Sequence, residues 1–181
     1  MSYIITTPSE FHDALIARLT ARLPSIPVTG YEEWGPVDIT GPCVLVQWED
    51  GLRGNLRNDG RYHHLFTLTA HCVVPKTLPN AVLIALDLAA EVERLLDHRA
   101  LFFVNDELQV RSDTVGVPTV LNNGDTTFLL GLAGMEARGV QWQQPLYLGP
   151  SEFEPSEERA NWRWAVNPVN PDDAGEYRPL E

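Results

Sequence analysis

The residues of this chain that could bind zinc through nitrogen or sulfur are its five histidines and two cysteines. A zinc site needs about four Cys or His ligands, which usually come as closely spaced pairs. Cys43 and Cys72 lie far apart in the sequence, and neither a Cys-x-x-Cys nor a His-x-x-x-His spacing occurs. We therefore predict that the chain holds no metal ion and no cofactor.

Nucleophilic and acid–base catalysis are not indicated either. The sequence contains no Gly-x-Ser-x-Gly elbow, and Cys72 lies on the apolar face of an alternating segment, where a core role is expected. The acidic pairs Glu157-Glu158 and Asp172-Asp173 lie near the C-terminus, in a segment that cannot hold two carboxylates rigidly across a cleft. We predict that the chain is not an enzyme.

A loop predicted over residues 50–61 is rich in glycine, asparagine and arginine. It lacks the Gly-Lys-Ser/Thr ending of a phosphate-binding loop, and no clear helix follows it. Two interpretations stay open: a mobile loop made soluble by arginine, or a contact loop for an acidic partner surface. The predicted partner-binding residues of this loop are Arg53, Arg57 and Arg61.

The charge balance limits the partners of this chain of 181 residues. Acidic residues outnumber basic ones by 25 to 13, which gives a net charge of −12 at pH 7. This charge works against attraction to nucleic acid or to anionic lipid. The N-terminus does not have the pattern of a secretory signal, and the apolar run over 81–90 is too short and too charged to span a bilayer. We expect a soluble, intracellular protein that binds neither nucleic acid nor membranes directly.

Two helices are predicted to position these residues. Thr7, Pro8 and Glu10 form the pattern of a capping box at the start of the first, and Pro24 ends it. The second runs over residues 79–97 and is apolar on more than one side, so the sheet and the first helix, or a neighbouring subunit, must cover it. The apolar stripe of the first helix consists of Phe11, Leu15, Leu19 and Leu23.

Strands are predicted over residues 43–48, 66–74, 107–112, 126–137 and 140–143. The second of these alternates most clearly, with His71 on the face opposite Cys72. Residues 122–125 are predicted to form a turn, and Gly139 to mark a bulge or a bend. The order of elements predicts an α+β fold: a mixed, largely antiparallel sheet with two helices packed on one face.

The character of the sequence changes at residue 150. Prolines recur, acidic residues cluster and periodicity is lost, so this segment cannot form a core of its own. Its aromatic residues nevertheless suit an arm that lies on another surface. We predict a domain over residues 1–149 and an extended acidic arm over residues 150–181. The predicted inter-subunit residues of the arm are Phe153, Trp162, Trp164 and Tyr177.

The order of five segments carries a resemblance to a known family. They are a short helix at 11–19 (FHDALIARL), a strand at 42–46 (PCVLV), a strand at 61–68 (RYHHLFTL), a helix at 86–92 (LDLAAEV) and a strand at 139–142 (GVQW). This order resembles the tail-terminator and tail-completion proteins, the minor tail and neck-region proteins of long-tailed bacteriophages. The resemblance covers about the first 150 residues as a pattern of elements and does not extend to the arm.

The resemblance implies a non-enzymatic structural protein of the virion. Such a protein forms a ring, commonly a hexamer, that caps the tail tube, ends its polymerisation and provides the surface for head–tail joining. Its implied partners are further copies of itself, the tail tube protein and the head–tail connector protein. Its implied location is the tail or neck of the virion, and the host cytoplasm during assembly. The arginines at 53, 57 and 61 would then contact the tube or the connector, and Trp162 and Trp164 would hold the arm on an adjacent subunit.

Two alternative functions stay open from the sequence. A head-side connector or adaptor of the neck would differ from a terminator mainly in its partner. A small enzyme with a site between subunits is the alternative from a different class. The residues that such a site would use are His63, His64, His71 and Glu107.

Overall fold

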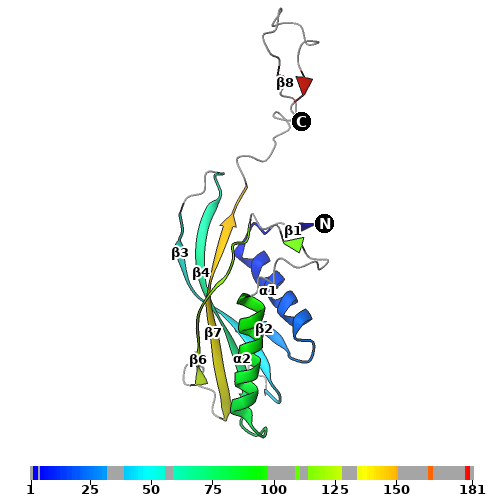
Figure 1. Cartoon of the computed structure of the whole chain (residues 1–181), viewed down its shortest axis with the longest axis vertical. Helices are drawn as coiled ribbons and strands as arrows, with labels where there is room; N and C mark the ends of the chain where they lie inside the picture. The colour runs from blue at the N-terminus through cyan, green and yellow to red at the C-terminus, as the bar shows by residue number, and fades with distance from the viewer. Residues whose placement is uncertain are drawn as a thin grey trace, which may run out of the picture.

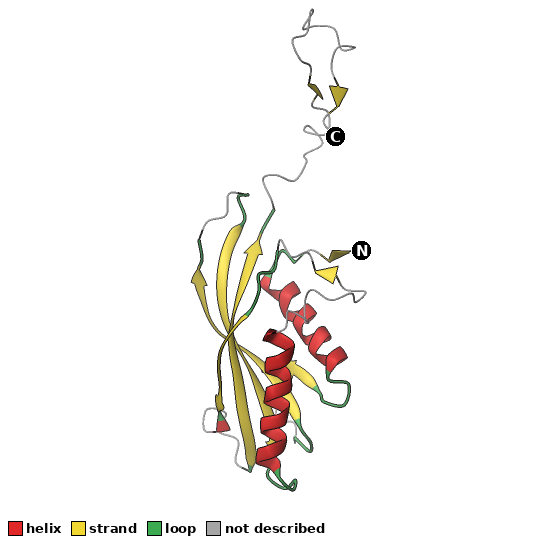
Figure 2. Ribbon diagram, viewed as in Figure 1, coloured by secondary structure: helices red, strands yellow, loops and turns green. Residues whose placement is uncertain are grey.

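A five-stranded mixed sheet with two helices on one of its faces forms the body of the protein (Figures 1 and 2). The computed structural model describes residues 2–3, 5–31, 39–55, 59–97, 109–110, 114–127, 134–150, 163–164 and 178–179. This architecture is the α+β fold predicted from the sequence. The predicted arm over residues 150–181 lies almost entirely outside the described residues.

The first helix begins where the sequence predicts, and the second begins at Ala81 instead of residue 79. Helix α1 (Pro8–Arg22) has a complete capping box, in which the Glu10 amide donates to Thr7 Oγ1 at 3.3 Å and the Thr7 amide donates to Glu10 Oε2 at 3.2 Å. The Thr6 amide and hydroxyl also donate to Glu10 Oε2, and these two bonds, followed by that from the Thr7 amide, lower the pKa of Glu10. Helix α2 (Ala81–Asp97) follows Asn80, which has a positive φ of 59° that asparagine tolerates better than most residues.

The sheet has the order β2-β3-β4-β7-β6, in which only the β2–β3 pair is parallel. Its strands are β2 (Val28–Gly30), β3 (Cys43–Arg53), β4 (Tyr62–Pro75), β6 (Thr119–Asp125) and β7 (Met135–Leu148). Two minor pairs lie outside this sheet. They join β1 (Ser2–Tyr3) to β5 (Gln109–Val110) and β8 (Arg163–Trp164) to β9 (Arg178–Pro179).

The long central strands correct two predicted boundaries. The loop predicted over 50–61 starts too early, because β3 continues to Arg53, and the strand predicted over 66–74 starts too late, because β4 begins at Tyr62. A bulge between Trp48 and Asp50 shifts the register, after which the pairing continues to Arg53 opposite His64. The polar residues there are held in a strand by pairing with β4, which hydrophobic alternation alone does not reveal.

The strand predicted over 126–137 is confirmed only at residues 135–137, with residues 128–133 outside the described residues, and the turn predicted over 122–125 is wrong. Residues 122–125 belong to β6, and β7 runs from Met135 through Gly139 to Leu148 without a bulge. The irregularity lies in β6 instead, between Val120 and Asn122. The strand predicted over 107–112 is described only at Gln109–Val110.

Gly139 allows two threonine side chains to pack across the sheet. A Cβ atom at this position would lie 2.5 Å from Thr126 Cγ2 and 3.0 Å from Thr69 Cγ2. We expect Gly139→Ala to lower the free energy of unfolding by about 1–3 kcal/mol, because both side chains would have to shift within a packed sheet. Urea denaturation measures the change. Gly41→Ala, where a Cβ meets nothing within 4 Å, is the control, and equal stability of the two variants would contradict the packing role.

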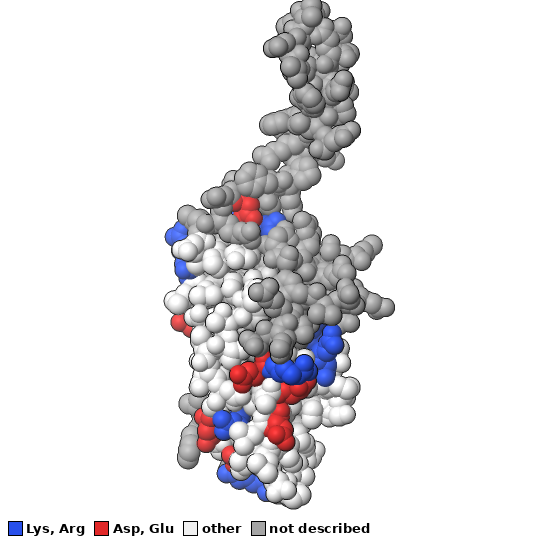
Figure 3. All heavy atoms as spheres, viewed as in Figure 1, with Lys and Arg blue, Asp and Glu red and all other residues white. Residues whose placement is uncertain are grey.

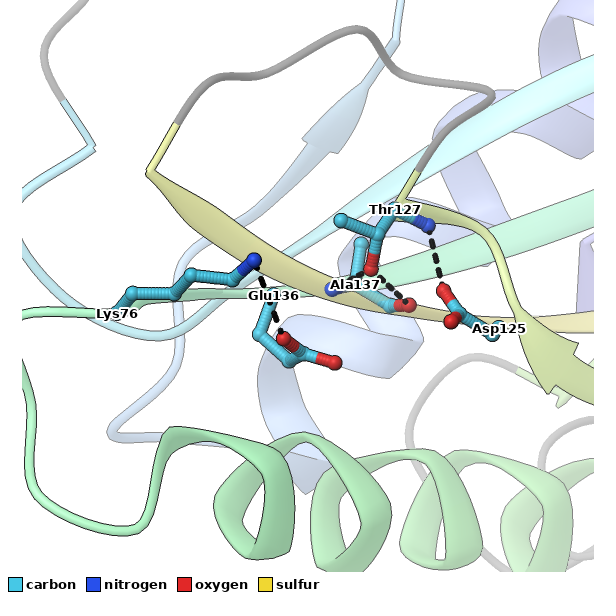
Figure 4. Close-up of polar contacts among 5 residues, drawn as sticks. All are labelled: Lys76, Asp125, Thr127, Glu136 and Ala137. Atoms are coloured by element: carbon cyan, nitrogen blue, oxygen red, sulfur yellow. Dashed lines mark hydrogen bonds and ion pairs between the residues drawn. The ribbon is translucent and has the colours of Figure 1, made fainter.

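Just beyond the lower end of β6, the side chain of Thr127 forms hydrogen bonds with the backbone of β7, as a backbone group of a paired strand would (Figure 4). Thr127 Oγ1 accepts from the Ala137 amide at 3.0 Å and donates to the Ala137 carbonyl at 3.3 Å. Asp125 Oδ1 accepts from the Thr127 amide at 2.8 Å, and this bond lowers the pKa of Asp125. These contacts fix where the chain leaves the sheet, next to the ion pair between Lys76 Nζ and Glu136 Oε2 at 3.7 Å.

The main core lies between the sheet and the two helices. From the sheet it includes Val44, Val46, Leu68, Ala70, Cys72, Val140, Trp142 and Leu146. From the helices it includes Phe11, Leu15, Leu19, Ala89, Val92 and Leu96. Cys72 is fully buried here, as predicted, and Cys43 is buried on the other side of the sheet with Leu45 and Val73. Burial raises the pKa of Cys72 to about 12 and that of Cys43 to about 11.

Candidate assembly surfaces

The residues suspected of catalysis do not come together. His63 and His71 share one face of β4 but lie eight positions apart, which is about 26 Å along a strand. His64 lies on the opposite face, with its ring stacked on Phe66 at 5.2 Å, and Glu107 lies outside the described residues. In the described part of the chain, no group of three or more His, Cys, Asp or Glu side chains is arranged to hold a metal ion.

His71 belongs to a hydrogen-bonded layer on the sheet face opposite the helices. Its side chain is buried, with Nε2 2.9 Å from Gln47 Oε1 and Nδ1 3.2 Å from Thr126 Oγ1. Glu49 continues the layer by accepting from Thr69 Oγ1 and, at 2.6 Å, from Gln141 Nε2. Both ring nitrogens of His71 are therefore engaged with side chains, and the layer joins β3, β4, β7 and the residue that follows β6.

The protonation of His71 should make the stability of the fold depend on pH. Burial lowers the pKa of His71, and the nearby Glu49 carboxylate opposes this only in part. Below about pH 6.5 the unfolded chain binds a proton that the folded chain does not, so stability is lost as the pH falls through that value. We expect urea denaturation at pH 7.5 and 5.5 to show a smaller stability loss for His71→Gln than for the wild type. An equal loss in both proteins would contradict this role of His71.

Three exposed apolar side chains lie on the outward face of the first turns of α2, followed by the exposed charged residues Asp87 and Arg94, and they have no partner among the described elements. Leu83 is 57% exposed, Val82 is 50% exposed and Leu86 is 36% exposed. The opposite side of the helix packs on β4, β6 and β7 through residues such as Ala89 and Val92. We call Val82, Leu83 and Leu86 the α2 face. The sequence predicted that this helix needs cover on more than one side, and α1 and the sheet leave the α2 face uncovered.

The three arginines predicted to bind a partner differ in their exposure and in whether the structure describes them. Arg53 is exposed at the end of β3, with its guanidinium 5.7 Å from the centre of the Tyr62 ring. Arg61 is only 5% exposed, so its predicted place on an exposed loop is wrong. Its amide donates to Asp59 Oδ1 at 3.2 Å, and its Nε lies 3.8 Å from Asp59 Oδ2, which draws the side chain inward. Arg57 lies outside the described residues.

The arm residues are described only in part. The backbone of Trp164 pairs with that of Arg178 in the β8–β9 pair, whereas Phe153, Trp162 and Tyr177 lie outside the described residues. Contact of the arm with an adjacent subunit stays a prediction.

The visible surface divides into a charged and an uncharged region. Figure 3 shows that charged side chains on this side of the molecule gather mostly over the lower half of the body. Over the upper part of the sheet, where β3, β4 and β7 reach beyond the helices, the visible surface is uncharged in the middle and carries charged side chains along its edge (Figures 1 and 3). Within the described residues, no helix is long and apolar enough to cross a membrane.

Comparisons with known proteins identify no family. No family model matches the chain, and no curated protein matches it. One solved structure, of a protein designated only by a sequence number, is similar over 77% of this chain and 92% of its own, with 20% identity and a TM-score of 0.47. A likeness of this degree indicates nothing about function.

Proposed function

We propose that this chain is a structural virion protein of a tailed bacteriophage that forms a ring on the end of the tail tube. The ring ends polymerisation of the tube and provides the surface to which the head docks. The observation that carries the assembly part of this proposal is the exposed α2 face. The resemblance in the order of elements supports the choice of a tail terminator among assembling proteins.

The α2 face suits a contact between copies of the chain. Exposed apolar side chains that lie together on a soluble protein mark a surface that another molecule covers. Full burial of a leucine or valine side chain contributes about 1.5–3 kcal/mol, and each of these three residues is already partly buried. The α2 face alone therefore gives a modest contact, which closure of a ring would reinforce by repeating it around the symmetry axis.

A closed ring also needs a second, different surface on each subunit, because its contacts are head-to-tail. Val117 and Leu121 are exposed at and just before β6 and offer such a surface. We expect the α2 face of one copy to contact the β6 edge of the next copy. This arrangement would leave the end of the β3–β4 hairpin available to other partners.

Light scattering combined with tube capping tests the proposal. We expect a discrete ring mass at high protein concentration, and we expect the protein to stop growth of tubes assembled from the tail tube protein of the same phage or prophage. Bovine serum albumin at equal concentration is the control for nonspecific inhibition of growth. Tubes that keep growing in the presence of the protein would contradict the terminator role, and binding to the head-side connector in the same assay would favour the neck-adaptor alternative.

A further inference from the structure

One face of the β3–β4 hairpin carries a continuous series of ring contacts from the core to the hairpin end. At the core, the ring of Trp48 lies 6.0 Å from that of Phe11 and 5.0 Å from that of Phe66. Trp48 is further fixed because its Nε1 donates to His12 Nδ1 at 3.1 Å. The inner part of the series is therefore anchored to α1, and Phe11 at its base is fully buried.

The outer part of the series becomes progressively exposed. The ring of His64 lies 5.2 Å from that of Phe66 and 4.4 Å from that of Tyr62. Tyr62 is 44% exposed, and the exposed Arg53 guanidinium lies over its ring at 5.7 Å. We call Trp48, Phe66, His64, Tyr62 and Arg53 the aromatic ladder. It offers an apolar surface that ends in a positive charge.

The backbone of the hairpin fixes the position of the ladder. A Cβ atom on Gly51 would lie 2.9 Å from Cε1 of Phe66, so only glycine lets this ring lie across β3. The hairpin is closed by the Gly54 amide, which donates to the His63 carbonyl at 2.9 Å. A preformed surface of this kind can bind an extended segment with little reorganisation.

The chain itself supplies a segment of matching chemistry at the same end of the sheet. Strand β7 ends at Leu148, which pairs with Tyr62, and Gly149 follows with a positive φ of 90°. The next eight residues, 151–158, read Ser-Glu-Phe-Glu-Pro-Ser-Glu-Glu. Four carboxylates and one phenylalanine complement the arginine and the rings of the ladder.

We propose that residues 151–158 of one copy bind along the aromatic ladder of a second copy. In this contact a glutamate pairs with Arg53, and Phe153 packs on the exposed rings of Tyr62 and His64. The inference rests on the proposed ring, in which the hairpin ends of neighbouring copies lie at the same height along the ring axis. It specifies how the subunits are linked.

The place where the chain leaves β7 favours binding of the segment to the ladder of a neighbouring copy over binding to the ladder of its own copy. The segment starts beside Tyr62, at the outer end of the ladder, so binding in its own copy would require the chain to reverse at once. Pro150 follows the turn at Gly149, and proline stiffens the chain there. An extended segment of eight residues spans up to about 27 Å.

Disulfide cross-linking of the full-length chain tests this proposal. Cys43 and Cys72 are buried and their pKa values are raised, so they should not react and need not be removed. We expect the double variant Tyr62→Cys/Glu154→Cys to form covalent multimers under mild oxidation. The matched control is Leu52→Cys/Glu154→Cys, because Leu52 is exposed in the same hairpin and lies opposite Leu65 on the other face. We expect the control to cross-link at least about tenfold more slowly.

Each outcome of the cross-linking decides between arrangements. An internal disulfide, seen as monomer with altered mobility on a non-reducing gel, would overturn binding to a second copy. Equal cross-linking rates in test and control variants would overturn the choice of the ladder as the docking surface. Light scattering of the wild type separates this inference from the proposed function. A ring mass without cross-links at the ladder would overturn only the inference. The absence of any oligomer would overturn both the inference and the proposed function.

A charge reversal provides a second readout. We expect Arg53→Glu, introduced into the double cysteine variant, to slow cross-linking by about threefold, which is the effect of losing one exposed ion pair. Lys76→Glu is the matched control, since Lys76 is an exposed cation next to Pro75, at the other end of β4. If Arg53→Glu slowed cross-linking no more than Lys76→Glu does, the proposed role of Arg53 would be overturned.

Discussion

Leu83→Glu is expected to reduce the protein to a monomer of 20.2 kDa at concentrations where the wild type forms a ring. Leu83 is the most exposed residue of the α2 face, so glutamate at this position remains solvated in the isolated chain and leaves the fold intact. In an assembled ring the same carboxylate would be buried without a partner. This costs about 3 kcal/mol or more per contact, which corresponds to more than about a hundredfold weaker association.

The mass measured by light scattering should be interpreted together with a thermal unfolding curve of the same variant. We expect the unfolding midpoint of Leu83→Glu to match that of the monomeric wild type. Ala17→Glu is the matched control, because Ala17 is exposed on α1 and the substitution adds the same charge to a helix surface. If Leu83→Glu retained both the ring mass and the capping activity, the α2 face would not be a subunit contact.

Trp142→Ala should have the largest effect on the stability of the single chain. Trp142 is fully buried on β7, in the core between the sheet and the helices. Truncation of a buried tryptophan costs about 3–5 kcal/mol, because the transfer free energy is lost and a cavity remains. A domain of this size has about 5–15 kcal/mol in total, so the variant should unfold at a much lower urea concentration.

Two further variants show whether the size or the polarity of Trp142 matters. Its Nε1 has no hydrogen-bond partner among the described residues. Trp142→Phe should therefore lose only about 1–2 kcal/mol, from the smaller volume. Leu52→Ala, at an exposed position of the same sheet, should change stability by less than about 0.5 kcal/mol. A loss for Trp142→Ala as small as that for Leu52→Ala would contradict the assignment of Trp142 to the core.

Local signals in the sequence predicted the helices and the clearest strand. The hydroxyl of Thr7 and the carboxylate of Glu10 form the predicted capping box, because this interaction needs only residues three positions apart. The alternation that places Cys72 in the core and His71 on the other face is likewise a property of one strand. Such features depend on a few neighbouring residues and can be predicted without knowledge of the fold.

Features that depend on pairing between strands could not be predicted in the same way. Residues 122–125 have the composition of a turn but lie in β6, because β7 provides a partner for each of them. The layer around His71 needs Gln47, Thr126 and Gln141 at neighbouring register positions, and the register was not known from the sequence. Similarly, Arg61 looked like part of an exposed loop, whereas its contacts with Asp59 and its burial are properties of the folded chain.

The α2 face shows where prediction from sequence reaches its limit. Hydrophobic periodicity indicated that α2 needs cover on more than one side, but it could not indicate which residues the single chain leaves uncovered. The structure assigns that role to Val82, Leu83 and Leu86. The sequence and the structure together therefore supply a specific surface for mutagenesis.

The central position of β4 has a consequence for how the chain reaches its folded state. One of its neighbours, β3, is close in sequence. The other, β7, is synthesised only after α2 and β6. Its pairing with β4 therefore joins residues that are distant in sequence, such as Tyr62 with Leu148 and Pro75 with Met135. Contacts between such distant residues slow folding, because the entropy of closing a long loop is lost before the pairing compensates for it. Until β7 emerges from the ribosome, one edge of β4 stays open, and its apolar half from Leu68 to Val74 can pair with other nascent copies. We therefore expect the yield of folding to fall where β7 and neighbouring nascent chains compete for this edge.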